Sequence, residues 1–238
     1  MEDDVAAAPA EPVADSGLAP DVANYAALRT AVAAFRSPVL PELVAGGGPR
    51  ATVSIGELAE AGALTVLESP PTLVASASGV SMLTAKDIRL GREPSKTGDP
   101  GTPGAVFGQP GDVVVVSGGS HAVVSVRTDA ALLAPGVVVL RVKPSVIDAH
   151  FLSGVVRAAA DAAGGRPIDL FAVAFPRVPI VEQQKVGAAI ARLMEIETAW
   201  RVQRLAVERI VRDGLSGLTS GTLRIADDAG GAGESHGR

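Results

Sequence analysis

The stretch that decides the fold is PGDVVVVSGGSHAVVSVR, residues 110–127. Two β-branched runs, 112–116 and 122–126, flank a short turn rich in serine and glycine. A phosphate-binding glycine loop would open a helix, whereas a second strand-like run follows here. The pattern is therefore typical of a β-hairpin and predicts a β-rich core around it.

The same pattern continues on both sides of the hairpin. Short apolar runs are separated by Gly, Pro, Ser and Asp, which is typical of strands in a twisted or barrel-like sheet. Further strands are predicted at 51–55, 64–67, 72–75 and 137–142. Residues 92–111 are rich in Gly and Pro and predict a long surface loop.

Helical patterns surround this β-rich region. Apolar residues at three- and four-residue spacing predict a short helix over 21–36, with Asp21 as its N-cap. A second helix is predicted over 148–163, before a short strand at 170–174. A long helix is predicted from residue 181 to residue 213, ended by Gly214.

These elements predict an α+β fold in which a β-rich domain with a long loop is preceded by a short N-terminal helix and followed by a long C-terminal helix. Ala, Pro and acidic residues without periodicity predict a disordered first segment, and Gly, Asp and Ser predict the same for the last. The predicted parts are a disordered acidic tail at 1–20, a helix and Gly/Pro linker at 21–49, the β-rich domain at 50–180, the long helix with its C-terminal end at 181–222, and a disordered tail at 223–238.

Composition limits the classes of function. The 238 residues include no cysteine, which excludes disulfides, thiolate zinc sites and cysteine nucleophiles. The net charge of -5 argues against a strongly basic nucleic-acid binder. However, residues 1–49 hold seven acids and two bases, whereas residues 50–180 hold eleven of each. The β-rich domain is thus neutral, and the acidic N-terminus, which is unlike a signal peptide, favours a cytoplasmic location.

Enzyme signatures are weak in this sequence. SPPT at 69–72 approaches the Pro-Pro motif of amino-methylating DNA methyltransferases, but Thr72 stands where an aromatic ring must stack on the flipped base. His121, His150 and His236 lack the spacing of a local metal site. We therefore expect no catalysis and no metal site in this chain.

Basic residues gather between residues 84 and 97, beside the predicted long loop. Lys and Arg neutralise phosphates, and Arg also reads guanine in the major groove. The hairpin turn adds hydroxyl and backbone donors. The candidate DNA-binding residues, more of them for phosphate than for bases, are Thr84, Lys86, Arg89, Arg92, Lys96, Ser117, Ser120, His121 and Arg127.

Four motifs, in this order, resemble the target recognition domains of type I restriction–modification specificity subunits. They are LTAKDI at 83–88, PGDVVV at 110–115, IDAHFL at 147–152 and VPIVEQQKV at 178–186. The resemblance covers about residues 50–222. A full specificity subunit has two recognition domains and two long helices, so this chain resembles a half subunit.

The resemblance implies that the β-rich domain grips double-stranded DNA and reads bases. It also implies that the long helix acts as a spacer and holds a DNA methyltransferase subunit, which binds S-adenosylmethionine and carries the catalysis. This chain itself would bind no cofactor.

The long helix carries a heptad-like apolar row that needs cover. The candidate interface residues are Val186, Ile190, Leu193, Trp200, Val207 and Val211. A two-fold homodimer, the 21–36 helix folding back on it, a helix of the methyltransferase subunit, or an ordinary intramolecular core would each provide that cover.

Two other functions stay open on the sequence. A protein-only adapter that binds no nucleic acid agrees with the neutral charge of the β-rich domain. An uncharacterised hydrolase or transferase would use the turn at 117–121.

Overall fold

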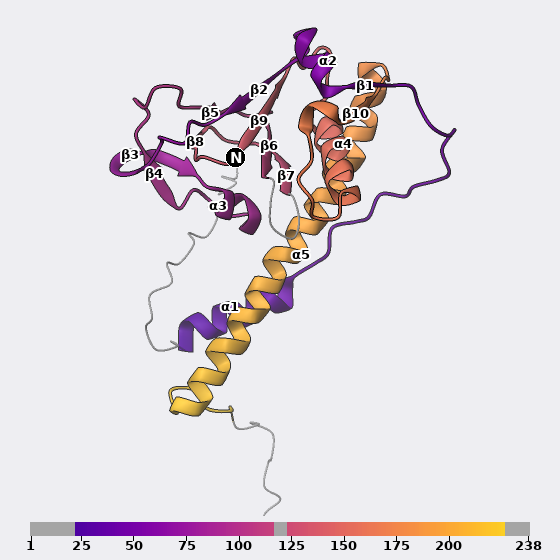
Figure 1. The fold of residues 1–238 in the computed structure, drawn as a ribbon. Helices are drawn as coiled ribbons and strands as arrows, with labels where there is room; N and C mark the ends of the chain where they lie inside the picture. The colour runs from indigo at the N-terminus through magenta and orange to yellow at the C-terminus, as the bar shows by residue number, and fades with distance from the viewer. Residues whose placement is uncertain (1–21, 117–122, 227–238) are drawn as a thin grey trace, which may run out of the picture. The chain divides into compact units, whose positions relative to one another are not determined.

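The structure is a computed structural model that describes residues 22–116 and 123–226 (Figure 1). It has an α+β fold and divides into two compact units. The larger unit is Ser37–Val202, and the smaller unit joins the residues up to Arg36 with those from Gln203 onward. Asp21, the disordered segment predicted at 1–20, the hairpin turn at 117–122 and residues 227–238 of the tail predicted at 223–238 lie outside the described residues. The first four residues of that predicted tail, 223–226, are described, and the Leu223 N–H donates to the Gly217 carbonyl at 3.0 Å.

The larger unit contains three sheets. One four-stranded sheet has the order β2-β9-β6-β7, a second has the order β4-β3-β8-β5, and β1 pairs with β10. All described pairs are antiparallel except β3 with β8. The strands are β1 (Thr52–Ser54), β2 (Leu64–Glu68), β3 (Ala75–Leu83), β4 (Lys96–Gly98), β5 (Phe107–Gly108), β6 (Val113–Val116), β7 (Val123–Val126), β8 (Ala131–Leu133), β9 (Val138–Val142) and β10 (Ala174–Pro176).

Two helices of this unit, α4 and α5, are long, and the others are short. The helices are α2 (Ile55–Glu60), α3 (Ala85–Leu90), α4 (Ala149–Ala162), the 3-10 turn η1 (Leu170–Ala172) and the first part of α5 (Ile180–Ser220). The predicted helix at 148–163 is confirmed as α4. The Asp148 carboxylate accepts a hydrogen bond from the Phe151 N–H and caps its first turn.

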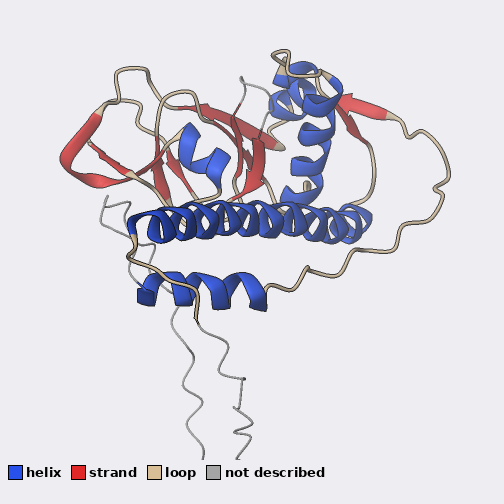
Figure 2. Cartoon of the chain, turned by 90° about the horizontal axis from the view of Figure 1, so that it is seen from below, coloured by secondary structure: helices blue, strands red, loops and turns tan. Residues whose placement is uncertain are grey.

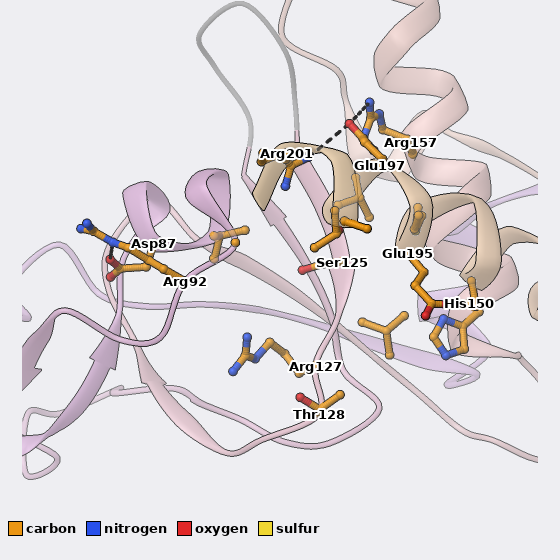
Figure 3. A pocket seen from close by; sticks show the side chains of 18 of the residues that line it. Asp87, Arg92, Ser125, Arg127, Thr128, His150, Arg157, Glu195, Glu197 and Arg201 are labelled. Carbon is orange, nitrogen blue, oxygen red and sulfur yellow. Dashed lines mark hydrogen bonds and ion pairs between the residues drawn. The ribbon is translucent and has the colours of Figure 1, made fainter. Parts of the chain in front are cut away.

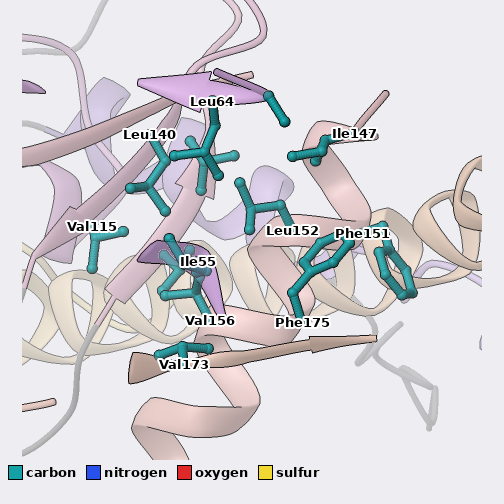
Figure 4. Packing of buried hydrophobic residues seen from close by; sticks show 13 residues of the cluster. Ile55, Leu64, Val115, Leu140, Ile147, Phe151, Leu152, Val156, Val173 and Phe175 are labelled. Atoms are coloured by element: carbon teal, nitrogen blue, oxygen red, sulfur yellow. The ribbon is translucent and has the colours of Figure 1, made fainter. Parts of the chain in front are cut away.

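Strand β6 explains why the sequence reads Val-Val-Val-Val. Successive strand residues point to opposite faces of a sheet, and here both faces are covered. Val113 and Val115 pack into a cluster with Leu152 of α4, while Val114 and Val116 pack into a second cluster with Leu133 of β8. In the first cluster the rings of Phe151 and Phe175 meet edge to face at 5.3 Å (Figure 4). The predicted hairpin strands at 112–116 and 122–126 are confirmed as β6 and β7.

The strand predicted at 72–75 is wrong. The chain makes a turn at Pro71 and Thr72, and β3 runs instead from Ala75 to Leu83. The small residues of β3 show no β-branched pattern, because its backbone at Gly79 lies very close to the backbone of β4 at Gly98. A Cβ added to Gly79 would lie 2.0 Å from the Gly98 carbonyl oxygen.

Three other segments also differ from the sequence prediction. The strand predicted at 51–55 ends at Ser54, because Ser54 and Glu57 form a capping box that starts α2. The segment 170–174 is mostly the turn η1, which is capped by Asp169. The predicted loop at 92–111 contains the short strands β4 and β5, which pair with β3 and β8.

In the smaller unit, the predicted helix at 21–36 is confirmed as α1 (Val22–Ala34). It lies alongside the C-terminal part of α5, where the Gln203 side-chain amide donates to the Val32 carbonyl at 3.2 Å (Figure 2). The helix end predicted at Gly214 is wrong, because α5 continues to Ser220. Gly214 serves packing instead, since a Cβ there would lie 3.1 Å from the Tyr25 ring.

Candidate nucleic-acid interface

An open groove of about 570 Å³ lies within the larger unit. Its walls come from α3 with the residues that follow it, from β7 and residues 127–129, from α4, and from α5 as far as Arg201. Figure 3 shows Arg127 and Thr128 across the groove from Arg157, Glu197 and Arg201.

Helix α3 positions the first wall. Thr84 is its N-cap and Asp87 its third residue, and their side chains form a reciprocal capping box. Gly91 ends the helix in the left-handed conformation, at φ 62°, which glycine adopts without strain. Thr84, predicted to face DNA, uses its hydroxyl within this capping box, so we assign it to the local fold.

Asp87 is fully buried at the base of this wall. A buried carboxylate is costly unless it is paired and hydrogen-bonded. The Arg92 Nε–H donates to it at 2.7 Å, and backbone and side-chain groups of Thr84 also donate to it. Burial by itself raises the pKa of Asp87, but hydrogen bonds from Thr84, Ser95 and Arg92 outweigh burial and hold the pKa well below its usual range.

Arg127 stands on the opposite wall, directly after β7. Its backbone is fixed, because its N–H donates to the Asp112 carbonyl at 2.8 Å and its carbonyl accepts from the Gly111 N–H at 2.9 Å. The Asp112 carboxylate is itself held by the Arg141 guanidinium, at 2.7 Å from Nη2 to Oδ2. The Arg127 Nε is buried and has no hydrogen-bond partner among the described residues. Most buried donors have a partner in the protein or an ordered water, so the Arg127 Nε marks a position where a water or an external acceptor would complete its hydrogen bonding.

The third wall is an ion network between α4 and α5. Arg157 contacts Asp161 at 3.0 Å and Glu197 at 3.1 Å, and Glu197 also contacts Arg201 at 3.2 Å. Sequence reasoning missed these residues as part of a site, because they resemble an ordinary solvated helix face. The i,i+4 spacing within each helix is visible in the sequence, whereas the Arg157–Glu197 pair requires the two helices to pack.

The charge of the groove is nearly balanced. Its lining holds four arginines, one histidine and five carboxylates. Arg92, Arg157 and Arg201 each have a carboxylate partner. In the part of the chain that the structure describes, Arg127 makes no ion pair, so it is the lining arginine best placed to meet an external anion.

The structure thus brings two of the nine predicted DNA-binding residues, Arg92 and Arg127, to one groove. Lys86 is exposed on α3, Arg89 is half-buried in the last turn of that helix, and Lys96 is exposed on β4. The predictions for Ser117, Ser120 and His121 lie outside the described residues.

The predicted partner interface on α5 needs a correction at its first two residues. Val186 and Ile190 pack against the core of the larger unit. Gly154 of α4 allows this approach, because a Cβ there would lie 2.5 Å from the Ile190 Cδ1. Leu193 and Trp200 are exposed by 40% and 53%, and Trp200 donates to the Ser37 hydroxyl at 3.2 Å. In the smaller unit, Val207 and Val211 are exposed by 39% and 53%.

Of the possible covers for α5, the structure contains two. Its first turns are covered by the core of the larger unit, and its last turns by α1. Neither covers Leu193, Trp200, Val207 and Val211 completely.

The motifs that carried the sequence resemblance are largely buried and structural. Asp87 and Asp112 fix the two walls of the groove, and Phe151 and Leu152 lie in the core. Gln183 is buried where α5 begins. Its amide donates to the carbonyls of Val146 and Val178 and accepts from the Asp148 N–H, which ties three segments together.

None of the helices formed by the described residues has the length and apolar character to cross a membrane. Within 22–116 and 123–226, no three side chains of the His, Asp or Glu type lie close enough to hold a metal ion.

No protein-family model matches the chain, and no curated protein matches it. Solved structures with a similar fold include the following two. The crystal structure of the HsdS subunit from Thermoanaerobacter tengcongensis is 20% identical, with a TM-score of 0.46 over 81% of this chain and 50% of that one. A structure concerning complex assembly and conformational transition of the type I R-M system is 19% identical, with a TM-score of 0.46 over 81% of this chain and 49% of that one. The chain spans about half the length of each.

Proposed function

We propose that this chain is a DNA-recognition subunit of a type I-like adenine methyltransferase system and has no catalytic activity of its own. The observation that carries the proposal is the groove, in which Arg127 presents a guanidinium with an unsatisfied Nε opposite a second wall containing Arg92. The ordered series of four motifs resembling specificity subunits supports the same proposal.

Phosphate oxygens would satisfy the Arg127 guanidinium, because arginine donates two parallel hydrogen bonds to phosphate. The near-balanced charge of the groove means that few phosphates are neutralised by this chain alone. Since the salt dependence of DNA affinity scales with the number of neutralised phosphates, we expect a shallow salt slope and modest affinity. A partner subunit would supply the remaining contacts.

The partner is a DNA methyltransferase subunit, which would hold S-adenosylmethionine and perform the reaction. Its docking surface, or that of a second copy of this chain, would be the exposed apolar side chains of α5: Leu193, Trp200, Val207 and Val211. Contiguous exposed apolar patches mark interaction surfaces, and these four side chains belong to the heptad-like row of α5.

The first experiment measures DNA affinity of the full chain against salt concentration, using a short duplex of random sequence. Arg127→Ala is expected to reduce the slope of log K against log[salt] by about 0.9, the contribution of one phosphate contact. Arg166→Ala is the matched control, because Arg166 is exposed, lies outside the groove and contacts a backbone carbonyl. An unchanged slope for Arg127→Ala contradicts the assignment of the groove.

The second experiment measures the mass of the full chain with and without a methyltransferase encoded beside it. A defined complex that methylates DNA only when this chain is present is the expected result. Trp200→Asp is expected to reduce the mass of that complex while the circular dichroism of the chain stays unchanged. If the complex of Trp200→Asp has an unaltered mass, α5 is not the docking surface. If the chain has no effect on DNA methylation, the protein-only adapter is favoured.

A further inference from the structure

The two oxygens of the Asp87 carboxylate have different partners. Oδ2 accepts from the Thr84 N–H at 3.0 Å, the Thr84 hydroxyl at 2.6 Å and the Ser95 N–H at 3.3 Å. Oδ1 accepts from the Arg92 Nε–H at 2.7 Å. One oxygen therefore organises the backbone on both sides of α3, and the other holds a single arginine.

Arg92 is held by one edge only. Its Nε–H meets Asp87, and its Nη2 donates to the Ser95 hydroxyl at 3.3 Å, so the Nε/Nη2 edge of the guanidinium is occupied. A guanidinium has five N–H donors, and two of the three that remain, one on Nη1 and one on Nη2, lie along its Nη1/Nη2 edge. No described residue accepts from Nη1, and 43% of the side chain is exposed. Figure 3 shows the guanidinium of Arg92 beside Asp87.

This arrangement fits a base edge better than a phosphate. The negative charge of Asp87 offsets the attraction of Arg92 for phosphates, but it leaves the geometry of the free edge intact. Two parallel N–H groups match O6 and N7 of guanine in the major groove. Because Asp87 and Ser95 already fix the side chain, little rotamer entropy remains to be lost when a base binds.

We propose that Arg92 reads a guanine through its Nη1/Nη2 edge and that Asp87 is the positioning residue that aims it. This inference rests on the proposed DNA-recognition function and adds to it a base-reading residue and its support. The sequence predicted phosphate contacts for most of the nine candidates, and the Asp87 contact is the reason to assign Arg92 to a base.

The test is selection of binding sites by the full chain from duplex DNA of random sequence, followed by sequencing of the bound fraction. A bidentate arginine–guanine contact discriminates by roughly 5- to 140-fold. Arg92→Lys keeps the charge but lacks the fork, so we expect one G·C position to lose its preference while the other positions and the salt slope stay unchanged. Lys96→Ala is the comparison, for which weaker binding to all sequences with an intact preference pattern is expected.

Asp87→Asn is the second variant, and its expected result is loss of preference at the same G·C position. In an Arg92→Lys background, Asp87→Asn should change that position no further, because its effect acts through Arg92. A general loss of folding would not erase preference at one position alone, and Arg92→Lys tests the inference even where Asp87→Asn fails to fold.

The outcomes separate the two claims. A preference pattern that survives Arg92→Lys overturns the base-reading role while leaving DNA recognition in place. A pattern lost in Arg92→Lys but kept in folded Asp87→Asn overturns the positioning role of Asp87. If the native chain enriches no DNA sequence, the proposed function is contradicted, and this inference is contradicted with it.

Discussion

Gln183 supplies a sharp test of how the long helix is anchored to the β-rich region. Its side chain is 3% exposed and makes three hydrogen bonds, to the Val146 and Val178 carbonyls and from the Asp148 N–H. Gln183→Ala removes all three hydrogen bonds at once and leaves the Val146 carbonyl, the Val178 carbonyl and the Asp148 N–H without this partner. Each such bond contributes roughly 1 kcal/mol net, and a buried group left without a partner costs more.

The expected loss is about 2–3 kcal/mol in the free energy of unfolding, taking roughly 1 kcal/mol per bond. The loss of all three hydrogen bonds gives the upper value of this free-energy loss. Val146 is 45% exposed, so water can replace the bond to its carbonyl, which sets the lower one. For a chain of this size the corresponding fall in melting temperature is roughly 4–12 °C.

The assay is urea unfolding followed by far-UV circular dichroism. Gln184→Ala is the matched control, because Gln184 is the neighbouring residue on α5 and is exposed. Gln183→Glu is a second variant that replaces two donors facing carbonyls with acceptors, and it should destabilise at least as much as Gln183→Ala. If Gln183→Ala and Gln184→Ala differ by less than about 0.5 kcal/mol, half of one hydrogen bond, the anchoring role is refuted.

Two further predictions follow from other contacts. The pKa of Asp87 is depressed in the folded chain, where its hydrogen bonds outweigh burial, so its stabilising contribution is complete well above the usual value of 3.8 and is lost as the pH falls through that value and below. Unfolding free energies measured between neutral pH and the acid limb should therefore decline less steeply in Asp87→Asn, and identical slopes would contradict the depressed pKa. Gly214→Ala would place a Cβ 3.1 Å from the Tyr25 ring and offset its gain in helix propensity. In a Tyr25→Ala background the same change should stabilise by about 1 kcal/mol, measured by thermal unfolding, and a loss there would contradict the contact.

Local patterns in the sequence were sufficient for several elements. The hairpin of β6 and β7 follows from two β-branched runs around a Gly/Ser turn, and α4 follows from the helical pattern that ends before Gly164 and Gly165. Strand β3 was missed, since its Ala, Ser and Gly residues have no strand pattern and pair with β4 and β8. The capping box of Ser54 and Glu57 was present in the sequence and would have located α2.

The candidate site depended more on tertiary structure. Its basic residue types and their clustering were visible in the sequence, and two of the predicted residues, Arg92 and Arg127, line the groove. Which arginine is paired could not be read from the sequence. The Arg157–Glu197 pair joins two helices, and the burial of the Arg127 Nε depends on the packing around it.

The sequence by itself determined the α+β class, the central hairpin, the short helix α1 before the β-rich region and the long helix α5 after it. Periodicity, caps and turn residues act within a few neighbouring positions, so these elements could be predicted locally. Only the tertiary structure decided that α5 continues past Gly214, that Val186 and Ile190 face the core, and that Asp87 holds Arg92. These outcomes depend on distances between side chains and on their removal from water, and both are set when separate elements pack against one another.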